Sequence, residues 1–467
     1  MIEFTFADLL AATGASVARR GVHDDVRLAG VTTDSRDVLP GQLFVGIHGP
    51  NFDGNAYAAT AIERGAGAVL LSDLVAASKL PASAPVALTN DTLRALGDLA
   101  SWHRSRLDCP VLGITGSCGK TTTKDVAAAL LAPVGEVVAA AKSYNNAIGV
   151  PLTLLRADAR TRAVVLEIGT NAPGEIATLT RIARPYVGLV TMIGHSHLEG
   201  LDDLEGVASE KGALGEHLGP DDHLVLPAAS PYLEHLSSRT RAQVRTFGEG
   251  GEGDWSAEDV RTDADGSSFT VRGRRVTTRL VGRHNVLNVT AAIAAVDAMG
   301  FDALESAAVL AEFEGAPHRM QRTEVHGITL LDDTYNSNPD SARAAMRVLS
   351  DANTSGRRVM VFGDMLELGA RSQLLHTQIG VEAAAARVEL LVCVGDLARA
   401  TAAGAMEGGM PSDRVVHVAS VDEAVTCVPR LVETGDVVLF KASRGMRLER
   451  VVESVGRAHG REAEGAR

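Results

Sequence analysis

The sequence predicts an α/β protein in which helices cover largely parallel sheets. Apolar residues make up 45% of the 467 residues while aromatic residues make up only 4%, which suits layers rich in Ala, Val and Leu. Short apolar runs alternate with helical patterns along most of the chain, as in strand–helix–strand units. One run, at 110–112, leads into a glycine-rich turn and then a helix, the local pattern of a phosphate-binding crossover. Because a chain of this length is too long for one core, we expect two to four domains, and the pattern along the chain indicates three.

Residues 1–107 are predicted to form a small N-terminal α/β domain. Short segments rich in Val, Leu and Ile predict its strands, and a segment rich in Pro, Ser and Ala at 78–85 predicts a connector. A long helix at 92–106 leads out of the domain. The predicted strands are 28–33, 43–47 and 68–71, and the other predicted helix is 57–64.

Residues 108–320 are predicted to form a central, P-loop-like, doubly wound ATPase domain. The phosphate loop lies at its first crossover, where such sheets bind ligands. A glycine-rich patch at 248–253 and an alternating run at 267–276 predict a β-rich excursion before a helix that begins at Asn285. The predicted strands are 111–115, 163–168, 187–193 and 223–226, and the first helix is 121–131.

Residues 321–467 restart the strand–helix pattern and are predicted to form a C-terminal Rossmann-like domain. This segment has no glycine-rich phosphate fingerprint of its own. The predicted strands are 328–331, 359–362, 390–394, 415–418 and 437–440, and helices are predicted at 341–349 and 376–386.

Charge and composition disfavour several classes of function. The formal net charge of −13 argues against nucleic acid as a partner, because such proteins usually present a basic face. The four cysteines have neither the density of a disulfide framework nor paired metal-ligand spacing. Glu3 and Asp8 break any signal-peptide pattern, and no uncharged apolar run reaches membrane-spanning length. We therefore expect a cytoplasmic protein without membrane insertion.

A phosphate site is predicted by the turn Gly113-Ile-Thr-Gly-Ser-Cys-Gly-Lys-Thr-Thr-Thr-Lys124. Glycines let backbone N–H groups close around phosphate oxygens, and the helix N-terminus adds partial positive charge. The spacing differs from that of the general P-loop, which has glycine where this chain has Ile114. Lys120 is expected to reach the β- and γ-phosphates, and the Thr121 hydroxyl to ligate Mg²⁺.

Three further polar sites admit more than one interpretation on the residues alone. Glu167 ends an apolar strand, where a carboxylate is either a metal ligand or a capped surface group. His195 and His197 can point the same way on an extended segment, as zinc ligands do. No third and fourth ligand has suitable spacing, so their role stays open. Lys211 has the sequence context of a solvated helix lysine.

Taken together, these stretches resemble the Mur ligase family along nearly the whole chain. The glycine loop alone places the chain only within the superfamily, whereas the last three of the motifs below are more specific. The motifs are Thr33-Asp-Ser-Arg36, Pro40-Gly-Gln-Leu-Phe-Val45, Asn51-Phe-Asp-Gly54, Tyr144-Asn-Asn-Ala-Ile-Gly-Val-Pro151, Glu167-Ile-Gly-Thr-Asn-Ala-Pro-Gly-Glu175, Asp332-Asp-Thr-Tyr-Asn-Ser-Asn-Pro339, Gly363-Asp-Met-Leu-Glu-Leu-Gly369 and Ser443-Arg-Gly-Met-Arg447.

The resemblance implies an ATP-dependent ligase that joins D-alanyl-D-alanine to UDP-N-acetylmuramoyl-tripeptide through an acyl phosphate, giving the pentapeptide precursor of peptidoglycan. It implies ATP and two Mg²⁺ ions, and we expect a monomer. The N-terminal domain would hold the UDP-sugar. In the C-terminal domain, Lys441, Ser443 and Arg444 would either contact the dipeptide or fix the closed interface.

The resemblance also implies roles for individual residues. The catalytic residues are Lys120, Glu167, His197 and Lys211, and Lys211 matches a lysine usually carried as a carbamate, whose oxygens can ligate metal. The metal ligands are Thr121, Glu167, His197 and Lys211. The nucleotide-contacting residues are Thr115, Gly116, Ser117, Cys118, Gly119, Lys120, Thr121, Thr122, Asn285, Asn288, Arg319 and Asp333, and the substrate-contacting residues are Ser35, Arg36, Asn145 and Asn146.

Two departures from the family pattern lie near the phosphate loop. Cys118 and Met192 each stand where the family usually has Asn. Backbone N–H groups, a helix N-terminus and Lys120 would lower the pKa of the Cys118 thiol and make it reactive. The competing hypothesis is a buried, inert thiol.

Two alternative functions are less well supported by the sequence. A related ligase that adds the third amino acid is disfavoured, because the segment that selects that amino acid lacks Asp-Asn-Pro-Arg. A nucleotide-gated binding protein without ligase activity is disfavoured by the retained set Glu167, His197 and Lys211.

Overall fold

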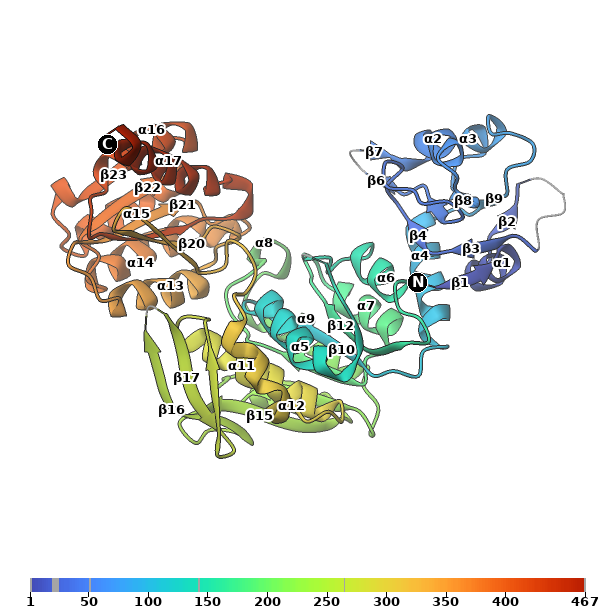
Figure 1. Cartoon of the computed structure of the whole chain (residues 1–467), viewed down its shortest axis with the longest axis horizontal. Coiled ribbons are helices and arrows are strands. Elements are labelled where there is room, and N and C mark those ends of the chain that lie inside the picture. Colours follow the sequence, from blue (N-terminus) through green and yellow to red (C-terminus); the bar gives the residue numbers. More distant parts are fainter. Residues whose placement is uncertain (1, 19–24, 50–51, 142, 264, 466–467) are drawn as a thin grey trace.

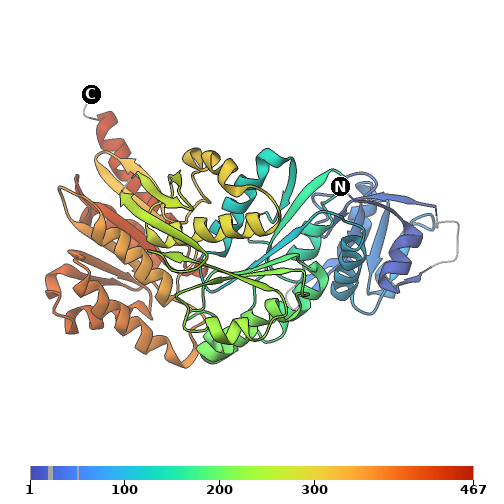
Figure 2. The ribbon, with the colours of Figure 1, turned by 90° about the horizontal axis from the view of Figure 1, so that it is seen from below.

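Three α/β units follow one another in the computed structural model, which describes residues 2–18, 25–49, 52–141, 143–263 and 265–465. Figure 1 shows the N-terminal unit in blue and the C-terminal unit in orange and red, on either side of a central unit in green and yellow. Figure 2 shows the same order along the long axis of the molecule. The predicted α/β class with three units is confirmed.

The N-terminal unit is built on a five-stranded sheet of order β2-β9-β8-β5-β4. Only β2 runs antiparallel to its neighbour. A capping box starts α1, because Thr5 and Asp8 each accept a hydrogen bond from the other's backbone N–H. The elements are β1 (Glu3–Thr5), α1 (Phe6–Thr13), β2 (Ser16–Val17), β3 (Arg27–Ala29), β4 (Val31–Thr32), β5 (Leu43–Val45), β6 (His48–Gly49), β7 (Phe52–Asp53), α2 (Ala58–Glu63), β8 (Ala68–Leu71), α3 (Leu74–Ser78), β9 (Val86–Leu88) and α4 (Thr92–Arg104).

The central unit is built on a nine-stranded sheet of order β11-β12-β10-β13-β14-β15-β16-β17-β18. The strands are parallel from β11 to β16, and β17 and β18 continue antiparallel. The elements are β10 (Val111–Thr115), α5 (Lys120–Leu131), β11 (Glu136–Ala139), α6 (Gly149–Leu154), β12 (Thr161–Glu167), α7 (Glu175–Ala183), β13 (Val187–Val190), α8 (Leu198–Leu201), α9 (Leu204–Glu216), β14 (His223–Pro227), α10 (Leu233–Ser237), β15 (Gln243–Glu249), β16 (Trp255–Asp263), β17 (Gly266–Val271), β18 (Arg274–Thr278), α11 (Arg283–Ala298) and α12 (Ala303–Ser306).

The C-terminal unit is built on a six-stranded sheet of order β19-β20-β24-β21-β22-β23, in which only β19 is antiparallel. The elements are β19 (Gln321–Val325), β20 (Ile328–Asp333), α13 (Pro339–Asp351), β21 (Arg358–Gly363), α14 (Ser372–Ala385), β22 (Leu390–Val394), α15 (Ala398–Glu407), β23 (Val415–Val418), α16 (Val421–Leu431), β24 (Val437–Lys441) and α17 (Glu449–Gly465). Within the described ranges, no helix is both long enough and apolar enough to cross a bilayer.

Strand β10 lies between two parallel strands whose ends form the site. It is flanked by β12 and β13, so the carboxyl ends of the three parallel strands meet at one edge of the sheet. Ile114 of β10 is in register with Glu167 of β12, and Thr115 is in register with Val190 of β13. The sheet therefore delivers the phosphate loop, Glu167 and the segment after β13 to the same place.

Two predicted strands, at 28–33 and 187–193, differ from the structure for local reasons. The first is interrupted at Gly30, which has φ of 88°, and forms β3 and β4 in two different sheets. The strand predicted at 187–193 ends at Val190, because the residues after it turn away to face the phosphate loop. The alternating run at 267–276 is a hairpin of β17 and β18, with a turn at Arg272 and Gly273 in the left-handed region. A period-2 pattern continues through such a turn and conceals it. In the predicted motif at 51–54, Asn51 lies outside the described residues.

The apolar cores are continuous across the predicted domain boundaries. One cluster joins Phe6 and Leu9 of the N-terminal unit to Leu154 and Leu166 of the central unit. A second joins Leu198 and Leu201 of α8, with Val207 of α9, to the α13 and α14 layer of the C-terminal unit. The units are therefore packed against one another, and the divisions after residues 107 and 320 stay predictions.

Truncating Phe6 tests how strongly the first of these shared clusters stabilises the chain. Its side chain is fully buried, so Phe6→Ala should lower the free energy of unfolding by about 3–5 kcal/mol. The matched control is Phe52→Ala, because Phe52 is 51% exposed and should change that free energy by less than about 0.5 kcal/mol. Denaturant titration measures both, and equal losses would contradict the shared core.

Candidate active site

The phosphate loop is shaped by two glycines at which no side chain fits. Gly116 has φ of 143°, and a Cβ there would lie 1.9 Å from Thr191 Oγ1. Gly119 has φ of 85° and is the N-cap of α5, and a Cβ there would lie 2.2 Å from Asn288 Oδ1. Both positions therefore require glycine, for backbone conformation as well as for space.

The segment after β13 is bound to this loop. Ser117 N–H donates to Met192 O at 2.9 Å, and the Ser117 hydroxyl lies 2.9 Å from both Gly194 N and Gly194 O. Ser196 Oγ donates to Ser117 Oγ at 2.8 Å. The position of the loop and the position of residues 191–196 are thus interdependent. At Met192 only the backbone carbonyl takes part in these bonds.

A buried carboxylate lies beside the loop. Glu167 is 2% exposed, and its two carboxylate oxygens accept from the Thr121 hydroxyl at 2.7 Å and from Asn145 Nδ2 at 2.8 Å. Both donors are neutral. Such a carboxylate is costly to bury unless a cation or several hydrogen bonds compensate its charge. The sequence-predicted residues Thr121, Glu167 and Asn145 are therefore in direct contact.

Two cations lie next to this carboxylate. Lys120 Nζ donates to Gly116 O at 2.7 Å, so the lysine folds back over the loop. Burial lowers the pKa of Lys120, and the charge of Glu167 opposes that shift. Arg319 Nη2 donates to Thr121 Oγ1 at 2.8 Å, and its guanidinium stacks 4.0 Å from the centre of the Tyr335 ring.

The C-terminal unit contributes a second buried ion pair. Lys441 at the end of β24 is 1% exposed and donates from Nζ to Asp333 Oδ2 at 2.5 Å and to Asn336 O at 3.0 Å. Asp333 also accepts from Met320 N–H at 3.1 Å, next to Arg319. The sequence-predicted nucleotide residues Asp333 and Arg319 thus belong to one connected segment.

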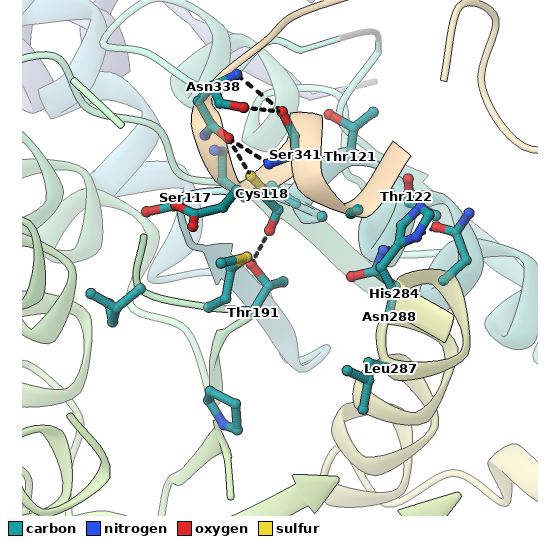
Figure 3. Close-up of a pocket in the computed structure, with 18 of the residues that line it drawn as sticks. Ser117, Cys118, Thr121, Thr122, Thr191, His284, Leu287, Asn288, Asn338 and Ser341 are labelled. Carbon is teal, nitrogen blue, oxygen red and sulfur yellow. Dashed lines mark hydrogen bonds between the residues drawn. The ribbon is translucent and has the colours of Figure 1, made fainter. Parts of the chain in front are cut away.

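Helix α11 presents polar groups to the same space. Asn288 Nδ2 donates to Asn285 Oδ1 at 3.1 Å, and Asn285 Nδ2 donates to Val281 O at 2.9 Å. Burial lowers the pKa of His284 to about 4, so this imidazole is neutral at pH 7. In Figure 3, His284, Leu287 and Asn288 lie along one helix, away from Cys118.

These parts surround one cavity of about 850 Å³ between the central and C-terminal units. Its volume is within the range of sites that hold nucleotides and other cofactors. One end is polar and carries the loop, Glu167 and Arg319. The lining also includes the apolar side chains of Pro227, Phe247 and Leu287. The site could therefore hold an anionic group against the loop and a flat apolar group further along α11.

The two histidines that the sequence left open do not form a zinc site. His195 Nδ1 lies 3.1 Å from Asp340 Oδ2, and His197 Nδ1 lies 2.8 Å from Glu367 Oε2. The second contact is close enough for an ion pair, but its atoms are not aligned for a hydrogen bond. The contact with His197 lowers the pKa of Glu367. No cluster of three or more His, Cys, Asp or Glu suited to a metal occurs among the described residues.

Lys211 is buried, which corrects its interpretation as a solvated helix lysine. It lies on α9, is 1% exposed, and has no hydrogen-bond or ion-pair partner among the described residues. Burial and, to a smaller extent, the charge of Lys120 lower its pKa to about 7. Its neighbour Glu210 instead accepts from Gly174 and Ile176 N–H groups at the start of α7.

The remaining substrate candidates are spread over two places. Ser35 and Arg36 follow β4 in the N-terminal unit and do not line the cavity. The Arg36 side chain is 83% exposed and pairs with Asp34 at 2.6 Å. Asn146 uses its side-chain oxygen to accept from Ile148 and Gly149 N–H groups at the start of α6. Only Asn145 of the four reaches the Glu167 cluster.

The structure corrects the prediction of a reactive Cys118. Its thiol donates to Asn338 Oδ1 at 3.2 Å, and Figure 3 shows the two residues facing each other beneath α13. Burial raises the pKa of the Cys118 thiol, and this effect exceeds the effects of Asn338 and Lys120, which lower it. The inert thiol, the competing hypothesis, is the better description.

Sequence reasoning missed several residues of the site. Tyr335 donates to Ser143 Oγ at 2.7 Å, Asp340 accepts from His195, and Glu367 contacts His197. Tyr335 lies in the motif at 332–339, Asp340 directly follows it, and Glu367 lies in the motif at 363–369, so the motifs marked the segments without assigning roles.

Comparisons with known proteins agree with this geometry. Three family descriptions match the chain: "Mur ligase family, catalytic domain" at 27–104, "Mur ligase middle domain" at 114–296 and "Mur ligase, glutamate ligase domain" at 318–444. The UDP-N-acetylmuramoyl-tripeptide–D-alanyl-D-alanine ligase of Bacillus subtilis (strain 168) is 34% identical over 436 residues, covering 93% of this chain and 94% of the relative. The protein of the same name in Escherichia coli (strain K12) is 35% identical over 445 residues, covering 92% and 94%.

Solved structures give the same picture. A crystal structure of MurF from Acinetobacter baumannii has a TM-score of 0.89 at 27% identity, covering 98% of this chain and 99% of that chain. MurF ligase from Thermotoga maritima in complex with ADP has a TM-score of 0.79 at 26% identity, covering 93% and 98%. A UDP-N-acetylmuramoyl-L-alanyl-D-glutamate–2,6-diaminopimelate ligase shares only the fold, with a TM-score of 0.53 at 17% identity.

Adding one methyl group at Gly119 should abolish phosphate binding without unfolding the chain. Gly119→Ala meets Asn288 and strains the backbone, so nucleotide affinity should fall at least tenfold, about 1.4 kcal/mol. The matched control is Gly456→Ala on α17, where a Cβ meets nothing within 4 Å. Calorimetric titration with ATP measures the affinity, and equal binding by both variants would contradict the assignment of the loop.

Proposed function

Because the chain belongs to the Mur ligase family, we propose that it joins D-alanyl-D-alanine to UDP-N-acetylmuramoyl-tripeptide in an ATP-dependent, ADP-forming reaction. The product is the pentapeptide precursor of peptidoglycan. The observation that carries this proposal is the cavity in which the glycine loop, Lys120 and the Thr121–Glu167 contact face the C-terminal unit. Neither a ligase that adds the third amino acid nor a non-catalytic binding protein is favoured by the comparisons.

ATP is the nucleotide of this site. We assign its phosphates to the loop from Thr115 to Thr122, where backbone N–H groups and Lys120 would offset their charge. The base would lie along α11, near Asn285 and Asn288, and Arg319 and Asp333 would contact the nucleotide from the C-terminal unit.

Thr121 and Glu167 fit a Mg²⁺ ion. They are hard oxygen donors in direct contact, and the buried carboxylate has only neutral hydrogen-bond donors. Mg²⁺ is usually held by one or two carboxylates, with phosphate and water completing its shell, so two protein donors suffice. When bound, Mg²⁺ would neutralise developing charge on the transferred phosphoryl group.

A second Mg²⁺ would need anionic oxygens from Lys211 and a nitrogen from His197. Lys211 is buried, has no hydrogen-bond or ion-pair partner in the described part of the chain and has a pKa of about 7, so its neutral amine could react with carbon dioxide to give a carbamate. The carbamate replaces an uncompensated buried cation by an oxygen ligand. We assign the two ions to these four residues, Thr121, Glu167, His197 and Lys211.

The reaction brings two anions together. A carboxylate oxygen of the tripeptide attacks the γ-phosphorus of ATP, and ADP leaves. The amine of D-alanyl-D-alanine then attacks the acyl carbon, and phosphate leaves. Lys120, the loop N–H groups and Arg319 lower the repulsion in the first step. Docking of the C-terminal unit excludes water from the acyl phosphate.

The substrates would bridge the units. Ser35 and Arg36 would hold the UDP-sugar in the N-terminal unit, while Asn145 would place the reacting carboxylate beside Glu167. Asn146 would act through the start of α6. Of the candidates in the C-terminal unit, Lys441 and Ser443 are buried and bonded to their own unit. The Arg444 side chain is 58% exposed and pairs with Glu449 at 3.5 Å, so it would have to exchange this partner to meet the dipeptide.

The organisation of the chain completes the proposal. We place the domain divisions after residues 107 and 320, close to the limits of the three matched families. We further propose that the protein is a monomer, since one chain supplies every residue assigned above. We also propose that it works in the cytoplasm.

Phosphate release tests the proposed reaction. With ATP and UDP-N-acetylmuramoyl-tripeptide, release should depend on added D-alanyl-D-alanine. Lys120→Ala should lower kcat about a thousandfold, or about 4 kcal/mol of transition-state stabilisation. Lys79→Ala, which removes an exposed lysine of the N-terminal unit, is the matched control and should leave kcat unchanged. Release that ignores the dipeptide would rule out this assignment.

The carbamylated fraction of Lys211 should depend on pH, because only the neutral amine reacts with carbon dioxide. At pH 7 about half of an amine with a pKa near 7 is neutral, against about one in three thousand for an ordinary lysine. At fixed dissolved carbon dioxide, the modified fraction should therefore rise from pH 6 to pH 8. Native mass spectrometry with peptide mapping measures it, and Lys441, which is equally buried but paired with Asp333, serves as the internal control. Modification of Lys441 alone would contradict the prediction.

A further inference from the structure

Two carboxylates of the C-terminal unit meet the loop that carries His195 and His197. Asp340, in the first turn of α13, accepts from His195 N–H at 2.6 Å and lies 3.1 Å from its Nδ1. Glu367, between β21 and α14, lies 2.8 Å from His197 Nδ1. His195 and His197 lie two residues apart on one loop, and each is in contact with a carboxylate from a different segment of the C-terminal unit.

The histidine loop and the C-terminal unit are close enough for their backbones to be in contact. A Cβ on Gly194 would lie 2.5 Å from Asp340 Oδ2, so this glycine allows the carboxylate to reach the loop. Glu199 N–H donates to Glu367 O at 3.2 Å, and a Cβ on Gly369 would lie 3.3 Å from Glu199 Cα. The C-terminal unit therefore cannot shift without moving the histidine loop.

The contact also holds two residues in an unfavourable backbone conformation. His197 has φ of 54° and Glu367 has φ of 63°, and neither is glycine. Residues other than glycine adopt this region only where the surrounding structure compensates the strain, and such residues cluster at functional sites.

On its other side, the histidine loop is bound to the phosphate loop. Ser117 Oγ bonds to Gly194 and Ser196, and the carbonyl of Cys118 accepts from Thr191. A path of direct bonds therefore runs from the C-terminal unit, through residues 191–197, to the loop that holds phosphate.

We propose that Asp340 and Glu367 are positioning residues that couple docking of the C-terminal unit to the geometry of His197 and the phosphate loop. This inference rests on the proposed function in one respect, namely that His197 is a metal ligand. A carboxylate at Nδ1 favours the tautomer with the proton on Nδ1 and leaves Nε2 free to ligate. The site would thus be complete only when the C-terminal unit, which would hold the dipeptide, is docked.

The proposal is tested first without nucleotide, metal or substrate. Hydrogen–deuterium exchange of the peptide spanning 194–201 should be at least fivefold faster in Asp340→Asn, because the His195 N–H then loses a charged acceptor. Long-range nitrogen NMR of the imidazoles should show His197 shifting from the Nδ1–H tautomer to a mixture in Glu367→Gln. The matched control is Glu389→Gln, which removes a carboxylate that pairs only within the C-terminal unit, with Arg358.

Kinetics then separate positioning from loss of structure. Asp340→Asn and Glu367→Gln should lower kcat at least tenfold while the KM for ATP changes less than twofold, and Asp340→Glu should recover part of the rate. Equal exchange in Asp340→Asn and Glu389→Gln, or an unchanged His197 tautomer in Glu367→Gln, would overturn the proposal even if the enzyme is a ligase. Dipeptide-independent phosphate release in the unaltered chain would instead count against the proposed function.

Discussion

The contact between Glu167 and Thr121 is the interaction on which the site depends. Glu167 ends a strand of the central sheet and Thr121 begins the helix after the phosphate loop, so their bond fixes the loop relative to the sheet. Arg319 donates to the same hydroxyl from the segment that enters the C-terminal unit. One hydroxyl thus links the sheet, the loop and the neighbouring unit, in a place where an unpaired carboxylate would be costly.

This arrangement explains why the nucleotide cavity lies between units instead of within one. The central unit alone provides the loop, the carboxylate and α11, but the outer wall comes from residues 319–344 and Lys441. A cavity divided in this way is closed only while the two units are docked. For a reaction with an acyl phosphate that water would destroy, such dependence protects the intermediate, because the site is complete only when the docked unit excludes solvent.

Much of the fold and the polar end of the site could be predicted from sequence, because both depend on local patterns. Gly116 and Gly119 predict a turn, and the position of Glu167 at the end of an apolar run predicts a carboxylate at the edge of the sheet. The contacts of Asp340 and Glu367 could not be predicted, because they join residues more than a hundred positions from the loop they touch. The pKa of Cys118 was misjudged for a related reason. Lys120, two residues away in sequence, lowers that pKa, whereas burial in the folded chain raises it and has the larger effect.

Lys120, Lys211 and Lys441 show how the partners of a lysine decide what its amine can do. Lys441 bonds to a carboxylate and a carbonyl, and these bonds fix the segment at 333–336. Lys120 bonds to a backbone carbonyl of the loop, which leaves its charge available to an anionic ligand. Lys211 has no hydrogen-bond or ion-pair partner among the described residues, and burial, the largest effect on its pKa, favours the neutral amine. These partners favour a structural role for Lys441, and they support the proposed roles of Lys120 as a phosphate-binding cation and of Lys211 as a nucleophile toward carbon dioxide.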